Sequence, residues 1–213
     1  KKSLMCENTV HVPNGVQTDL YRQPPPPPAE FDAIPGPRVG YVGTLHAERL
    51  DVPLILDVAE RAGDQFSFVF VGPDSLDSET RSSLEERDNI FFIPPVNYRR
   101  LPEFVCNFDV CSIPHALNPF THSLDPLKAY EYLASGRPII STPVDGVLPL
   151  SEFITLAETP GQFHDSVRKI LSGDEKSSSE ARRNAAEENS WRRRAEYIEQ
   201  LVEKNLARKR RFL

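Results

Sequence analysis

Residues 123–142, S-L-D-P-L-K-A-Y-E-Y-L-A-S-G-R-P-I-I-S-T, predict a loop, a helix, a turn and a buried strand in immediate succession. Asp125 is a good N-cap residue, because its carboxylate can accept hydrogen bonds from free N–H groups of the first turn. Pro126 suits the first helical position, where a missing N–H costs nothing. Gly136 favours the left-handed conformation that ends helices, and the proline after it precedes an apolar strand. The stretch therefore predicts a helix over about 126–135.

Two oppositely charged side chains lie on this predicted helix, since Lys128 and Glu131 are three residues apart. The free N–H groups and positive dipole end of a helix can hold a phosphate. A cation and a carboxylate beside such a site could serve a diphosphate and a sugar hydroxyl. An ordinary capped helix with an i,i+3 salt bridge explains the same spacing. Spacing alone favours this second interpretation.

The rest of the chain alternates strand-like and helix-like segments. Apolar runs predict strands at 39–43, 66–71, 90–93, 109–113, 139–140 and 154–157. Helical periodicity predicts helices at about 51–62, 76–87, 101–108 and 161–172, and again from residue 177 onward. Asp51 is the expected N-cap of the first of these helices. Regular alternation predicts an α/β fold with a doubly wound, Rossmann-like parallel sheet of about six strands and a C-terminal helical tail.

Composition restricts the functional class. The net charge of −6 argues against binding nucleic acid in bulk, and no apolar run approaches the length of a membrane span. Cys6, Cys106 and Cys111 fit no metal spacing and are predicted to be buried thiols in a reducing compartment, which predicts a cytoplasmic protein. The sequence contains no Asp-x-Asp metal motif and no Walker A sequence.

The segment K-A-Y-E-Y-L-A-S-G-R-P-I-I-S-T at 128–142 resembles the donor-site segment of GT-B glycosyltransferases. The likeness is greatest to retaining, family 4-like enzymes that build bacterial polysaccharides. Their pattern has two glutamates separated by seven residues. Glu131 matches the second glutamate, and Ser123 stands where the first would be.

A second resemblance follows the first predicted strand. Related enzymes often have Gly-Arg-Leu there, with a lysine shortly after. Here Gly43 is followed by Thr44 in the arginine position, and Arg49 stands in the lysine position. Arg49 can still grip a diphosphate with two hydrogen bonds. A salt bridge to Glu48 or Asp51 at the start of the next helix is the alternative interpretation of Arg49.

The resemblance implies a nucleotide-sugar site at the carboxyl ends of the strands. The residues implied are Gly43, Thr44, Arg49, Asp125, Leu127 and Lys128 for the diphosphate, Glu131 for the ribose, Pro94 and Val96 for the base, and Ser123 beside the sugar. A turn explains the prolines at 94 and 95 equally well. His46, His115 and His122 fall in the same loops, and one of them could approach the donor, although an isolated loop histidine is more often solvated.

The implied reaction is retaining transfer of a sugar from a UDP-sugar or GDP-sugar to a glycan or lipid-linked acceptor. No cofactor or metal is expected, because helix N-termini and cations neutralise the leaving diphosphate. Residues 1–38 would be a crossover segment and proline-rich linker, 39–175 the nucleotide-sugar-binding domain, and 176–213 helices that return toward an N-terminal domain preceding residue 1. Unidentified catalytic groups would belong to that domain. The R-K-R-R run at 208–211 could touch anionic lipid, although a solvated terminus explains it too.

Two alternatives keep the same fold. One is a nucleotide-sugar epimerase, which needs acid and base side chains near the sugar. The other is a non-catalytic module that only binds a nucleotide sugar, an interpretation favoured by Ser123 and Thr44 in place of glutamate and arginine. Analysis of the products separates the three hypotheses, because they predict a glycoside, an epimer or no product.

Overall fold

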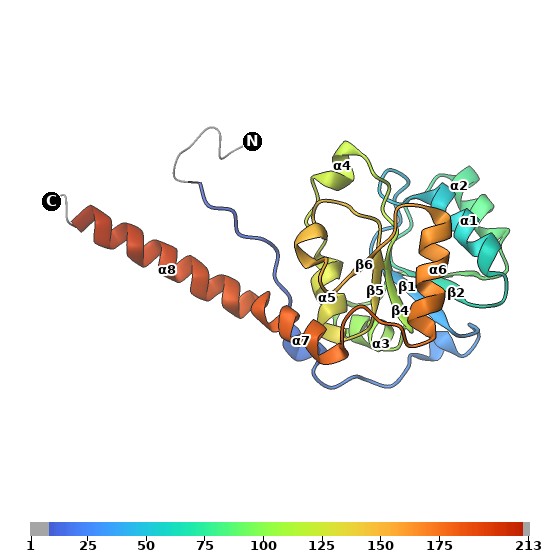
Figure 1. The fold of residues 1–213 in the computed structure, drawn as a ribbon, viewed down its shortest axis with the longest axis horizontal. Helices are drawn as coiled ribbons and strands as arrows, with labels where there is room; N and C mark the ends of the chain where they lie inside the picture. The colour runs from blue at the N-terminus through green and yellow to red at the C-terminus, as the bar shows by residue number, and fades with distance from the viewer. Residues whose placement is uncertain (1–8, 211–213) are drawn as a thin grey trace.

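The structure is a computed structural model that describes residues 9–210, with side chains to residue 206. In this part of the chain, parallel strands form one sheet in the order β3-β2-β1-β4-β5-β6. Strand order proceeds outward from β1 in both directions, so the sheet is doubly wound, and the predicted α/β class is confirmed (Figure 1). The strands are β1 (Arg38–Val42), β2 (Ser67–Val71), β3 (Ile90–Ile93), β4 (Val110–Ile113), β5 (Ile139–Ser141) and β6 (Thr155–Leu156).

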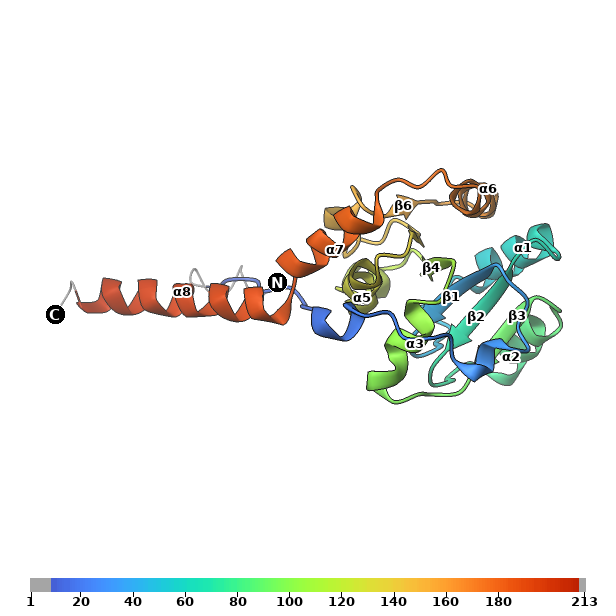
Figure 2. The ribbon, with the colours of Figure 1, turned by 90° about the horizontal axis from the view of Figure 1, so that it is seen from below.

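Helices cover both faces of this sheet (Figure 2). All five residues of β2 are buried, as expected for parallel strands with helices on both sides. One face packs against α1 (Val52–Ala62), α2 (Ser78–Glu85) and α6 (Pro160–Leu171). The other packs against α3 (Leu101–Val105) and α5 (Leu127–Ser135), with α7 (Ser179–Glu188) on α5. The short α4 (Pro119–His122), which the sequence did not predict, follows β4.

The ends of α1 and α5 test the predicted caps. Asp51 caps α1, since its Oδ1 accepts a hydrogen bond from the Leu54 N–H at 3.0 Å. Gly136 ends α5 with φ of 75°, as predicted. The predicted cap at the start of α5 is wrong, because the helix begins at Leu127 and no side chain caps it. The Asp125 carboxylate instead accepts the Asn14 backbone N–H at 2.6 Å and the Tyr130 hydroxyl at 2.9 Å.

The segment before β1 packs onto the sheet. Its Val16, Tyr21, Phe31 and Ile34 are buried in the core on the α3 and α5 face. Residues 13–15 form no turn, and Val16 directly after them pairs with residues 189–191. The Val16 N–H donates to the Asn189 carbonyl, and the Trp191 N–H donates to the Val16 carbonyl, both at 3.1 Å.

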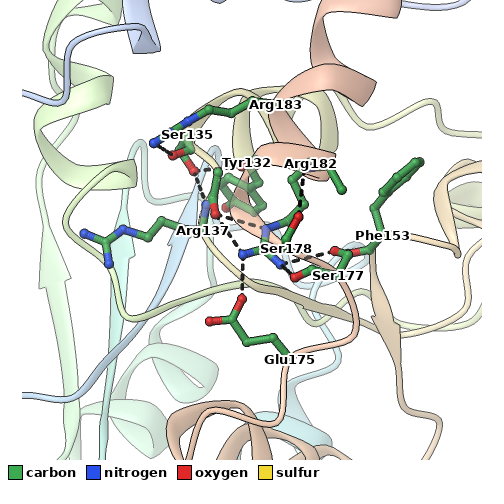
Figure 3. Close-up of polar contacts among 11 residues, drawn as sticks. Tyr132, Ser135, Arg137, Phe153, Glu175, Ser177, Ser178, Arg182 and Arg183 are labelled. Atoms are coloured by element: carbon green, nitrogen blue, oxygen red, sulfur yellow. Dashed lines mark hydrogen bonds and ion pairs between the residues drawn. The ribbon is translucent and has the colours of Figure 1, made fainter.

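Buried Arg182 of α7 holds the C-terminal end of α5 (Figure 3). Its guanidinium donates to the Gly136 carbonyl at 3.0 and 2.9 Å and to the Ser177 carbonyl, and it pairs with Glu175 at 2.6 Å. Arg183 donates to the Ser135 carbonyl at 3.1 Å. These cations satisfy carbonyl groups that a helix end leaves free, and they complement its negative dipole end. These contacts therefore hold the C-terminal end of α5 in position.

The last helix, α8 (Trp191–Arg210), projects away from the sheet and its covering helices (Figures 1 and 2). Several large apolar side chains of α8, among them Trp191, Ile198 and Val202, are exposed. None of the described helices is both long enough and apolar enough to span a bilayer. The predicted lipid contact at 208–211 lies outside the described side chains. Cys106 and Cys111 are buried free thiols, and Cys6 lies outside the described residues.

Candidate functional site

A cavity of about 460 Å³ lies at the carboxyl ends of β1 to β4. Residues that directly follow these strands form its walls, together with the start of α5. This is the edge where doubly wound sheets bind their ligands. The lining residues are Val42, Gly43, Arg49, Val71, Gly72, Pro73, Pro95, Val96, Tyr98, Leu101, His115, Leu124, Asp125, Pro126, Leu127, Lys128 and Glu131.

Two glycines let the loops after β1 and β2 touch each other beside the cavity. Gly43 has φ of 129° and Gly72 has φ of 145°, both in the region that side chains disfavour. A Cβ atom on Gly72 would lie 2.4 Å from the Gly43 carbonyl oxygen, which no real structure tolerates. A Cβ on Gly43 would lie 3.3 Å from Cε of Lys128. The backbone therefore leaves room for the lysine side chain.

Lys128 is a half-buried cation that no carboxylate neutralises. Its ammonium lies 4.7 Å from the ring centroid of Tyr41, and no hydrogen bond or ion pair joins it to any described residue. Burial, and then the charge of Arg49, lower the pKa of Lys128 to about 7, while Glu131 acts in the opposite direction. The i,i+3 salt bridge with Glu131, favoured from spacing alone, does not form. The lysine is therefore available to an anion in the cavity.

Arg49 is the second such cation. Its Nε is buried without a hydrogen-bond partner, and no ion pair links it to Glu48 or Asp51 in the part of the chain that the structure describes. The Asp51 carboxylate caps α1 instead. The guanidinium lies 6.0 Å from the ring centroid of Phe120. The salt-bridge interpretation of Arg49 is therefore wrong, and the cavity wall carries two cations and no neutralising contact to either.

Glu131 lies in the first turns of α5 and lines the same cavity. Its side chain is almost fully buried, and its Oε1 has no hydrogen-bond partner. Burial raises the pKa of this carboxyl, while Lys128 and Tyr98 act in the opposite direction. A buried oxygen without a partner is costly, so a ligand hydroxyl that donates to it would recover free energy.

His115 follows β4 and is completely buried, so the expectation of a solvated loop histidine is wrong. Both ring nitrogens lack a hydrogen-bond partner, and the ring centroid lies 6.2 Å from that of Tyr41. Burial, and then the charges of Lys128 and Arg49, lower the pKa of His115 to about 2. The imidazole is therefore neutral. The only sequence signal for it was a histidine directly behind a buried strand.

The structure brings together seven of the ten predicted site residues. Those around the cavity are Gly43, Arg49, Val96, Asp125, Leu127, Lys128 and Glu131. Thr44, Pro94 and Ser123 do not line it, and the Ser123 hydroxyl instead donates to the Phe120 carbonyl at 2.6 Å. Pro95 takes the place expected for Pro94. Tyr98 and Leu101 were missed, because only the folded chain brings them to the cavity, whereas His115 was named as one of three histidines in the site loops. No cluster of potential metal ligands occurs among the described residues.

Comparisons with known proteins show the family to which the chain belongs. Residues 36–173, well over half of the chain, match the family model described as glycosyl transferases group 1. The chain is 26% identical over 202 residues to TuaH of Bacillus subtilis (strain 168), named as a teichuronic acid biosynthesis glycosyltransferase. That match covers 90% of this chain and 50% of TuaH, so the chain spans about half the length of this relative.

Solved structures share the fold. Sucrose-phosphate synthase from Thermosynechococcus elongatus superposes with a TM-score of 0.72 at 21% identity, over 92% of this chain and 52% of that one. Anabaena Alr3699/HepE, solved in complex with UDP and glucose, gives a TM-score of 0.68 at 15% identity, over 91% and 55% of the two chains. The fold and the family match agree. The chain belongs to the group 1 glycosyl transferases and has the Rossmann-like fold of a GT-B C-terminal domain.

Proposed function

We propose that this chain is the donor-binding domain of a glycosyltransferase and that its cavity binds a nucleoside diphosphate sugar. The observation that carries the proposal is a pair of cations, Lys128 and Arg49, that face one cavity without a carboxylate partner among the described residues. Two uncompensated positive charges in a partly buried wall favour a ligand with at least two negative charges. A diphosphate supplies them.

The start of α5 supports the same ligand. No side chain caps this helix, and Pro126, Leu127 and Lys128 line the cavity. Free N–H groups and the positive dipole end of α5 are therefore directed toward the region of the two cations. Gly43 adds backbone that a phosphate can approach closely, because it carries no side chain.

The remaining walls suit the rest of a nucleotide sugar. Glu131 offers an acceptor oxygen without a partner, which fits ribose hydroxyl groups. Val96 and Pro95 present an apolar surface to the base. The neighbour Alr3699/HepE was solved with UDP and glucose, so we propose a UDP-sugar or GDP-sugar as donor.

We infer the reaction from the family. The donor sugar would pass with retention to a glycan or lipid-linked acceptor, and the name of TuaH supports a polysaccharide acceptor. Residues outside 1–213 would hold the acceptor and supply catalytic groups, since the chain spans half of TuaH. A non-catalytic sugar-nucleotide module remains a second candidate, because neither Thr44 nor Ser123 lines the cavity.

Replacing Glu131 by alanine tests the proposed ribose contact. Hydrogen bonds to a charged group contribute about 1.5–3 kcal/mol, so UDP affinity should fall at least about tenfold. Folding should change little, because Oε1 of Glu131 makes no hydrogen bond within the chain. Isothermal titration calorimetry measures the affinity, with Glu203→Ala on α8 as the matched control. Equal UDP affinity of Glu131→Ala and the native chain would remove Glu131 from the site.

Lys128 makes nucleotide binding depend on pH. Its pKa of about 7 in the free chain means that the ammonium loses its proton as pH rises from 7 to 9. A bound diphosphate favours the charged form, so binding must take up a proton over this range. The terminal phosphate of UDP, with a second pKa of about 6, is already ionised there. UDP affinity should therefore fall as pH rises, by up to about tenfold per pH unit.

Calorimetry at pH 7 and pH 9, in buffers of different ionisation enthalpy, measures both the affinity and the proton uptake. Lys128→Arg is the matched variant, because arginine stays charged at both pH values. Its UDP affinity should be nearly independent of pH. A native chain that binds UDP equally well at both values, without proton uptake, would show that the Lys128 ammonium does not contact the ligand.

A further inference from the structure

The family match assigns no role to His115, which is a residue of the cavity wall. Its backbone is fixed by hydrogen bonds, because the His115 N–H donates to the Ile113 carbonyl at 3.0 Å and the His115 carbonyl accepts the Thr142 hydroxyl at 2.6 Å. His115 is one of the residues that line the cavity, and its side chain has no exposed surface. Neither nitrogen of the His115 ring has a hydrogen-bond partner among the described residues.

A buried polar atom without a partner costs free energy, and folded proteins keep few of them. Edge-on packing against Tyr41 fills space but uses neither nitrogen. The titratable groups that face the ring are Lys128, Arg49 and Tyr41, of which two are cations. The two cations among these neighbours cannot accept a hydrogen bond from the N–H group of the His115 ring. A ligand that accepts hydrogen bonds can.

The charges around His115 select the class of ligand. A neutral imidazole carries one N–H donor and one acceptor nitrogen. An anion drawn to Lys128 and Arg49 brings oxygen atoms that accept hydrogen bonds but do not donate them. The imidazole N–H can serve such an oxygen, whereas an imidazolium beside two cations would be repelled by them.

We propose that His115 contacts the donor substrate, with its neutral ring donating an N–H to a phosphate oxygen of the nucleoside diphosphate that Lys128 and Arg49 hold. The inference rests on the proposed function. It adds a binding residue from the end of β4 to those from β1 and α5. In this arrangement the diphosphate contacts residues that follow β1, a residue that follows β4 and the start of α5.

Replacing His115 by phenylalanine keeps an aromatic ring against Tyr41 and removes both nitrogens. We expect Kd for UDP to rise about tenfold, which is about 1.4 kcal/mol. His115→Asn and His115→Gln each keep an N–H donor, and one of them should restore most of the affinity. His164→Phe is the matched control, because His164 of α6 is also buried with an unpartnered Nε2 but does not line the cavity. It should bind UDP like the native chain.

Calorimetric titrations with UDP and UDP-glucose separate the possible failures. A native chain that binds neither ligand overturns the proposed function and this inference together. If His115→Phe binds UDP as tightly as the native chain does, the inference about His115 is overturned and the proposed function stands. A loss confined to UDP-glucose also overturns it, because the ring would then contact the sugar.

A spectroscopic measurement on the native chain covers the case in which His115→Phe does not fold. Nuclear magnetic resonance of ¹⁵N-labelled imidazole groups reports the protonation and hydrogen bonding of each ring. The His115 ring should stay neutral from pH 5 to pH 8, and one of its nitrogen signals should shift when UDP is added. Ring signals of His115 that UDP leaves unchanged would overturn the inference.

Discussion

Replacing Lys128 and Arg49 together by methionine should lower UDP affinity at least a hundredfold. Each residue is expected to make a charged hydrogen bond to the diphosphate, worth about 1.5–3 kcal/mol. Loss of both removes about 3–6 kcal/mol, which corresponds to roughly a hundredfold to ten-thousandfold in Kd. The fold should survive, because no described residue forms an ion pair with either side chain. Isothermal titration calorimetry with UDP and GDP measures the effect.

The two single replacements should not contribute equally. Arg49 lowers the pKa of Lys128, so Arg49→Met lets the lysine keep its proton more readily. The remaining cation then binds the diphosphate better than before, and the loss in Arg49→Met is partly offset. Lys128→Met has no such compensation. The sum of the single losses should therefore be smaller than the loss in the double variant, as is usual for neighbouring charges.

The matched control replaces two exposed cations of α6, Arg168 and Lys169, by methionine. This variant has the same net charge as the double variant at the cavity, and neither residue lines the cavity. It should bind UDP like the native chain. Equal losses in both double variants would mean that overall charge, and not the cavity, attracts the nucleotide.

The second large effect concerns transfer. The chain of 213 residues, tested alone, should bind UDP-sugar or GDP-sugar and transfer no sugar. Holding both substrates in reactive geometry can supply about 7–11 kcal/mol of a barrier. We propose that the acceptor is held by residues outside 1–213, so this chain can position only the donor. Its cavity residues all lie between Val42 and Glu131, within the sheet and its covering helices.

The experiment uses one sample for two measurements. Nucleotide titration first shows that the protein is folded and binds a donor. Radiolabelled UDP-glucose and GDP-mannose are then incubated with the same protein and a panel of glycan and lipid acceptors. Labelled product formed by this chain alone would contradict the division of labour that we propose.

Local sequence rules predicted much of the fold, because each depends on a few neighbouring residues. The Asp51 cap and the Gly136 helix end are such features, and both formed. The Asp125 cap failed for a tertiary reason. Its carboxylate binds Asn14, which is 111 residues away in the sequence, so no local rule could have shown it. Val16 likewise pairs with residues 189–191, a contact between distant parts of the sequence that no local rule could have shown.

The candidate site was predictable where residues directly follow strands. Gly43, Arg49 and Val96 reach the cavity because the carboxyl ends of parallel strands meet at one edge. His115 also follows a strand, but its burial depends on packing against Tyr41, which the sequence does not reveal. Spacing on α5 suggested a salt bridge between Lys128 and Glu131. The folded cavity keeps the two charges apart, and this separation underlies the proposed ligand site.

Nuclear magnetic resonance titration of the ¹⁵N-labelled chain with UDP and GDP tests the central claim most directly, because it reports both binding and its location. We predict that at least one nucleotide shifts the amide signals of Gly43, Gly72, Val96 and Lys128 in a saturable manner. Signals of Gly63 and Asp88, at a second hollow of the surface, should stay unchanged. No shift with either nucleotide, or shifts confined to residues outside the cavity, would contradict the assignment of this cavity as a nucleotide-sugar site.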